Sequence, residues 1–96
     1  MKYFHRTTLS PDVVVAAAKA YFGARLAPAE ESARRVGYSG TLGKVAIGVK
    51  ADGGHYTFVE AETDQVGESE LDKLTKRFLA ELHRRAEPTH EVRGAY

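Results

Sequence analysis

Two segments of alternating polar and apolar residues, joined by a glycine-rich turn, constrain the fold of this chain most strongly. Residues 44–50 alternate aliphatic with polar or small side chains, and residues 55–63 show a weaker alternation. A period of two is typical of extended strands, whose side chains point to opposite faces in turn. Residues 52–54 (Asp-Gly-Gly) suit a tight hairpin turn, because glycine accepts positive φ. We therefore predict an antiparallel sheet.

Helix signals flank these strands on both sides. Ser10 followed by Pro11 is typical of a helix start, and Pro28 marks the latest point at which that helix can end. Ser69 and Pro88 bracket a second helical pattern with a leucine and phenylalanine stripe. The predicted order is β-α-β-β-β-α, with strands at 2–9, 33–39, 44–50 and 55–63 and helices at 11–26 and 70–86.

This order predicts an α+β fold: a curved antiparallel four-stranded sheet with two helices packed on one face. It is similar in outline to the repeat unit of TATA-binding-protein-like folds and to helix-grip ligand-binding domains, in element order alone. With 96 residues, the chain has room for one domain. We assign residues 1–88 to that domain and residues 89–96 to a flexible C-terminal tail. The N-terminus carries no secretory signal pattern and the longest apolar run is short, which predicts a cytoplasmic protein.

Motifs for catalysis and metal binding are missing at the required spacings. The chain has no cysteine, and its four histidines form no i,i+4 pair. His5 and His55 could approach each other across adjacent strands, but two ligands are too few for a stable zinc site. Residues 37–44 lack the spacing of a phosphate-binding loop. We predict no enzyme, no cofactor and no metal site, and leave open whether the acidic segment 60–72 binds a cation.

The charge balance hides opposed blocks along the chain. The net charge is +1, which disfavours a general polyanion binder. Residues 32–50 nevertheless carry only basic charges and residues 51–72 only acidic ones. The C-terminal helix carries a basic patch, which gives the alternative of a weak nucleic-acid-binding module. That patch consists of Lys73, Lys76, Arg77, Arg84 and Arg85.

Two helices can cover only one face of such a sheet, and the uncovered face gives the main functional hypothesis. The side of residues 45, 47 and 49 is the natural partner of the helices. The opposite side offers small residues, with either residues 57, 59 and 61 or Tyr56 and Phe58 beside them, depending on the register. We therefore predict partner binding there or at a sheet edge, most simply as a homodimer. The predicted partner face comprises Tyr38, Ala46, Gly48, Tyr56 and Phe58. A small apolar ligand is the other alternative, held in a cavity that Tyr21, Tyr38, Tyr56 and Phe58 would line.

Overall fold

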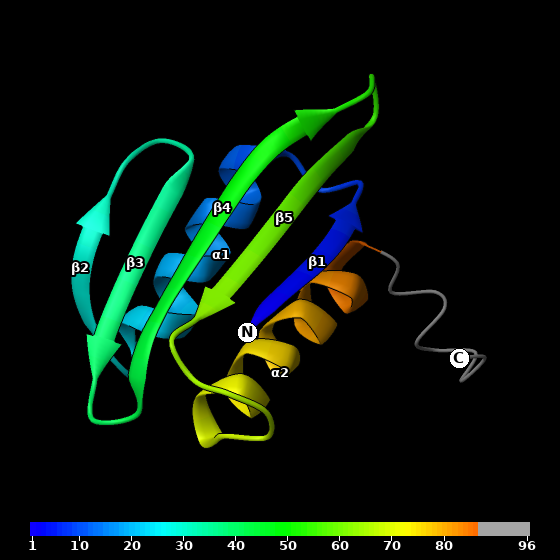
Figure 1. The fold of residues 1–96 in the computed structure, drawn as a ribbon. Helices are drawn as coiled ribbons and strands as arrows, with labels where there is room; N and C mark the ends of the chain where they lie inside the picture. Colours follow the sequence, from blue (N-terminus) through cyan, green and yellow to red (C-terminus); the bar gives the residue numbers. More distant parts are fainter. Residues whose placement is uncertain (87–96) are drawn as a thin grey trace.

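A five-stranded antiparallel sheet with two helices on one face forms the fold in the computed structural model, which describes residues 1–86 (Figure 1). The elements are β1 (Lys2–Thr7), α1 (Pro11–Gly23), β2 (Ala27–Glu31), β3 (Arg35–Gly40), β4 (Gly43–Asp52), β5 (Tyr56–Thr63) and α2 (Glu70–Ala86). The strand order across the sheet is β1-β5-β4-β3-β2. The predicted tail 89–96 lies outside the described residues. No helix in the described part of the chain is long and apolar enough to cross a membrane.

The prediction of four strands was wrong, because β2 is a fifth strand at the edge of the sheet. We had expected α1 to reach residue 26, whereas it ends at Gly23, and the chain then turns into β2. Pro28 cannot donate a backbone hydrogen bond to a neighbouring strand, so we predicted no strand around it. An edge strand tolerates proline, and the register of β2 against β3 shifts between Pro28 and Glu30.

The face of the sheet that the helices cover is the predicted one. Val45, Ile47 and Val49 of β4 are buried, as are Val59 and Ala61 of β5. Figure 1 shows α1 behind the middle of the sheet and α2 running beside β1. The strict alternation of β4 therefore decides which of its side chains enter the core.

Aromatic rings fill the space between the two helices and the sheet. Phe22 of α1 packs against Phe78 of α2, with 5.2 Å between ring centroids, and both side chains are fully buried. Phe22 also stacks with Tyr38 of β3 at 6.1 Å. Tyr21 contacts Phe78 and donates its hydroxyl to the carbonyl oxygen of Leu74 at 3.0 Å. These contacts fix the helices relative to the sheet.

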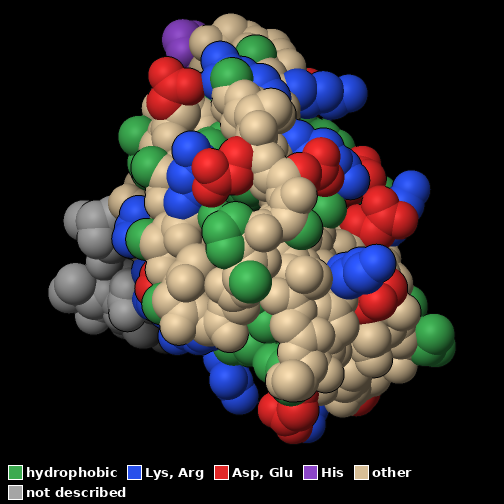
Figure 2. Space-filling model, turned by 90° about the vertical axis from the view of Figure 1, so that its left-hand side faces the viewer, with side chains coloured by type: hydrophobic (Ala, Val, Ile, Leu, Met, Phe, Trp, Pro, Cys, Tyr) green, Lys and Arg blue, Asp and Glu red, His purple; other side chains and the backbone are tan. Residues whose placement is uncertain are grey.

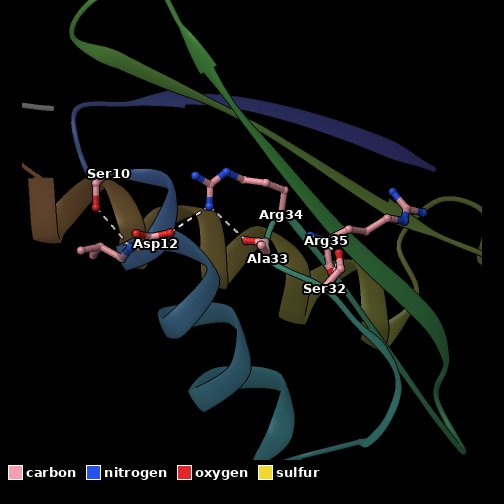
Figure 3. Close-up of polar contacts among 7 residues, drawn as sticks. Ser10, Asp12, Ser32, Ala33, Arg34 and Arg35 are labelled. Carbon is pink, nitrogen blue, oxygen red and sulfur yellow. Dashed lines mark hydrogen bonds and ion pairs between the residues drawn. The ribbon is translucent and has the colours of Figure 1, made fainter.

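Polar contacts at the start of α1 connect it to the turn before β3 (Figure 3). The Ser10 hydroxyl accepts a hydrogen bond from the backbone N–H of Val13 at 3.3 Å, which confirms Ser10 as the N-cap. The Arg34 guanidinium donates to the Asp12 carboxylate at 2.8 Å. Both side chains of this ion pair are exposed, so its contribution to stability is about 0–1 kcal/mol.

A buried carboxylate connects β5 to the first turn of α2. Asp72 is fully buried and accepts hydrogen bonds from the hydroxyls of Thr63 at 2.7 Å and Ser69 at 2.9 Å. The Ser69 hydroxyl in turn accepts from the Asp72 backbone N–H at 3.1 Å. Burial by itself raises the pKa of Asp72, but the hydrogen bonds from Thr63 and Ser69 hold that pKa below its ordinary value. The charged form is therefore part of the fold.

Gly43 begins β4 with a φ of +128°, a conformation that side chains rarely adopt. We expect Gly43→Ala to lower the free energy of unfolding by about 1–3 kcal/mol, because the strained backbone adds to a collision with Asp64 and Gln65. Urea unfolding followed by circular dichroism measures this change. Gly54→Ala is the control, since a β-carbon at Gly54 meets nothing within 4 Å. Equal stability of the two variants would contradict the expectation.

Candidate functional site: the open face of the sheet

The face of the sheet opposite the helices, called the open face below, is defined by the strand register. Phe4 of β1 pairs with Glu60 of β5, which pairs with Gly48 of β4, which pairs with Arg35 of β3. Residues that pair across neighbouring strands share a face. This row, called the reference row below, therefore runs across four strands and identifies the open face on each of them.

An exposed aromatic pair, Phe4 and Phe58, lies on the β1–β5 side of the open face. The two rings stack with 5.6 Å between centroids, and Phe4 keeps 58% of its surface exposed. Cations surround the pair: Lys50 lies over the Phe58 ring at 5.6 Å, and the Arg6 guanidinium lies over Tyr56 at 4.6 Å. Phe4 is mostly exposed and Phe58 is half-buried. Leaving this apolar surface in water is unfavourable, so the pair is the strongest indication of a binding surface.

A furrow of small residues on β4 lies beside the aromatic pair. It consists of Ala46 and Gly48, which the register places on the open face, whereas Gly37 of β3 shares that face but is buried by the Glu30 side chain. A β-carbon added to Gly48 would lie 3.5 Å from the Arg35 guanidinium, an ordinary van der Waals contact. The structure therefore has room for a side chain at Gly48. Small residues let another molecule approach the backbone closely.

Charges of both signs occupy the open face. Glu60 and Glu62 of β5 lie in its middle, and the Lys2 ammonium is 4.0 Å from the Glu60 carboxylate. Arg6 binds Asp52 at 3.1 Å and Arg35 binds Glu30 at 3.2 Å. Figure 2, which views the molecule from the β2 side, shows basic and acidic groups interspersed there as well. The electrostatic pattern is therefore mixed, which suits another mixed surface better than a polyanion.

The residues predicted for the partner face divide between the two sides of the sheet. Ala46, Gly48, Tyr56 and Phe58 lie together on the open face. Tyr38 does not: it is buried against Phe22 on the helix side, where burial raises the pKa of its hydroxyl. Tyr38 pairs with Val45, whose side chain faces the helices, whereas its neighbour Gly37 pairs with Ala46 on the open face.

The four residues predicted to line a ligand cavity are likewise not brought together. Tyr21 and Tyr38 pack in the core, whereas Tyr56 and Phe58 lie on the other side of the sheet. The space between the helices and the sheet is filled by Phe22 and Phe78. The helix-grip cavity therefore has no counterpart in these residues.

The basic patch predicted on α2 is partly neutralised by neighbouring carboxylates. Lys73 lies 3.8 Å from Glu70 and Lys76 lies 3.1 Å from Glu68. Arg85 lies 4.0 Å from Glu81. Arg84 lies at a groove between β1 and α2, and Arg77 is exposed on the same helix. The patch is a row of mixed charges over most of its length.

The histidines and the acidic segment do not assemble a metal centre in residues 1–86, where no three His, Asp or Glu side chains converge. His5 has His83 of α2 as a neighbour, at 6.4 Å between ring centroids. In the acidic segment, the Asp72 carboxylate accepts hydrogen bonds from the Thr63 and Ser69 hydroxyls inside the fold.

Sequence reasoning missed two exposed members of the open face, Phe4 and Arg6. The alternation of residues 2–9 places Phe4 on the same side as Lys2 and Arg6, a side to which we assigned no function. A phenylalanine on an otherwise charged face was the signal for an exposed aromatic site. Its neighbour Phe58 is brought to it only by the pairing of β1 with β5, which sequence order does not reveal.

Comparison with known proteins leaves the site to be interpreted from its own geometry. The sequence matches no protein family model, and it matches no curated protein.

Proposed function

We propose that this protein is a non-enzymatic assembly module that binds a second copy of itself through the open face. The observation that carries the proposal is the exposed Phe4–Phe58 pair beside a furrow of small residues. A projecting pair and a shallow furrow on one surface are self-complementary, as a twofold interface requires. Burying both rings on association would also add apolar area to a small domain.

One twofold arrangement satisfies both shape and charge. An axis parallel to the strands, between β4 and β5, places β1 of each copy over β3 of the other and β5 over β4, so that Phe58 of one copy faces Lys50 of the other. In the reference row, Phe4 of one copy then faces Arg35 of the other, and Glu60 faces Gly48. A cation–π contact favours the approach of Phe4 to Arg35. Gly48 has no side chain and so leaves space for Glu60. Two sheets packed in this aligned manner cross at about −30°.

The same face is less suited to single-stranded nucleic acid. Stacking aromatics flanked by cations are what such ligands need, and Phe4, Phe58 and Lys50 provide them. Glu60 and Glu62, however, lie in the centre of the face, where they repel phosphates. Nucleic-acid binding is therefore the second candidate, and the experiment below separates the two.

We expect the wild-type mass to be twice that of one chain at tens of micromolar in sedimentation equilibrium, within the affinity range of small interfaces. Gly48→Lys should weaken the dimer by about tenfold or more, because a long side chain fills the furrow while the fold accepts a β-carbon there. Phe4→Ala should weaken it similarly, through loss of the projecting ring.

Val66→Lys is the matched control, since it adds the same charge at a residue that is 90% exposed in the β5–α2 connection. It should dimerise as the wild type does. A wild-type mass of one chain at these concentrations would overturn the proposal. A monomer that binds oligothymidine, with binding lost in Phe4→Ala, would establish the nucleic-acid function in its place.

A further inference from the structure

The outer edge of β1 presents free backbone hydrogen-bonding groups. The Met1 amino group donates to the Thr63 carbonyl oxygen and the Thr63 N–H donates to the Met1 carbonyl, both at 2.9 Å. Antiparallel pairing alternates along a strand, so Tyr3 and His5 also bond to β5. The backbone groups of Lys2, Phe4 and Arg6 therefore point away from the sheet, and no strand in residues 1–86 pairs with them.

A groove runs beside this edge, between β1 and α2. Its volume is about 640 Å³, within the size range of ligand sites. Leu79 and Ala80 of α2 and Phe4 of β1 supply apolar surface, and Lys76 and Arg84 supply positive charge. Within residues 1–86 the remaining lining residues are His5 and His83, so no acidic side chain of this range lines the groove, although Lys76 also pairs with Glu68 at 3.1 Å.

His5 adds an independent sign of an incomplete site. Its Nε2 atom is buried and has no hydrogen-bond partner, although the ring lines the groove. Burial, and then the neighbouring His83, lower the pKa of His5, which favours the neutral ring. A buried nitrogen without a partner is costly, and a ligand in the groove could supply the missing hydrogen bond.

We propose that the β1 edge and this groove bind an extended acidic peptide segment of a partner protein by strand addition. About five residues of the segment would pair with Lys2–Arg6 through the outward backbone groups of Lys2, Phe4 and Arg6. Its side chains alternate: one set reaches Leu79 between Lys76 and Arg84, and the other lies beside Phe4. Carboxylates in the first set complement the two cations of α2.

The charges also argue against a second copy of β1 as the added strand. Antiparallel pairing of two β1 strands about Phe4 would set Lys2 of each copy opposite Arg6 of the other. Like charges directly opposite one another destabilise a strand pair. The peptide site therefore uses the β1 edge and not a second β1 strand, although Phe4 belongs both to this groove and to the open face.

The probe is a fluorescein-labelled pentapeptide that alternates glutamate and valine, with blocked termini, titrated with full-length protein and followed by anisotropy. We expect saturable binding, and no binding of the same peptide with lysine in place of glutamate. Arg84→Glu should weaken binding by about tenfold or more. Arg85→Glu changes the charge equally at the next residue, which does not line the groove, and should leave binding within about twofold.

Hydrogen exchange tests the strand addition itself. Peptide binding should slow exchange of the Phe4 and Arg6 amides, which point outward, and leave those of Tyr3 and His5, already bonded to β5, unchanged. Three outcomes would overturn the proposal: equal binding of the glutamate and lysine peptides, equal losses in the two arginine variants, or unchanged exchange at Phe4 and Arg6. Tighter binding of oligothymidine than of the glutamate peptide would also overturn it.

Discussion

Phe22→Ala is expected to lower the free energy of unfolding by about 3–5 kcal/mol, the usual cost of removing a buried phenylalanine. Phe22 is fully buried and contacts Tyr21, Tyr38 and Phe78, which come from both helices and from the sheet. No neighbouring element can close the resulting cavity without moving a helix. Because small domains are stabilised by about 5–15 kcal/mol in total, the variant should be partly unfolded at moderate urea concentrations.

Phe4→Ala makes the same chemical change on the open face and serves as the control. More than half of the Phe4 surface is exposed, so its removal should cost less than about 1 kcal/mol in monomer stability. Urea unfolding at low concentration, where association is negligible, compares the two variants directly. Similar losses in both would show that the open face is part of the folding core, contrary to the register.

Asp72→Asn is expected to destabilise the protein by about 1–3 kcal/mol at pH 7, because an amide cannot accept both hydroxyl hydrogen bonds in that site. Asp72 is fully buried between β5 and α2, where Thr63 and Ser69 donate to its two oxygens. Asp12→Asn is the matched control, since the Asp12 side chain is 86% exposed. That variant should lose about 1 kcal/mol or less.

The effect of Asp72 depends on pH with a definite sign. The pKa of Asp72 in the fold lies below its unfolded value of about 3.9, so its stabilisation is complete above that value and is lost as pH falls through the folded-state pKa. Asp64 also contributes stability that is lost as pH falls below its unfolded pKa, because the hydrogen bond from the Lys44 backbone N–H lowers its pKa in the fold. Wild type and Asp72→Asn should therefore converge in stability as acid is added. A constant difference down to pH 2 would contradict this assignment.

The fold was predictable where one local rule dominated. The α2 helix occupies residues 70–86 as expected, because Ser69 and Asp72 form its capping contacts. The alternation of β4 gave the correct buried side. Sequence patterns failed at β2, since strand formation by residues 27–31 depends on pairing with β3, and Pro28 alone indicates a loop.

The candidate site was predictable only in part, because it is assembled by pairing between distant strands. Ala46 and Gly48 share a side by alternation, but Tyr56 and Phe58 join them only through the register of the β4–β5 hairpin, which the sequence left open. Phe4 reaches Phe58 only through the β1–β5 pairing. Tyr38 lies two residues after the buried Val36, so alternation within β3 was the signal that it faces the core. Its side chain consequently lies in the core.

The irregular edge at β2 limits how far this sheet can grow. Pro28 lacks an N–H donor, and the shifted register that follows it interrupts the regular spacing of the outer backbone groups. Open-ended fibres require two edges that accept a strand, one on each side of every molecule. Here regular pairing is available at β1 alone. Because like charges also disfavour a second copy of β1 at that edge, edge-to-edge pairing between copies of this chain should not build open-ended polymers.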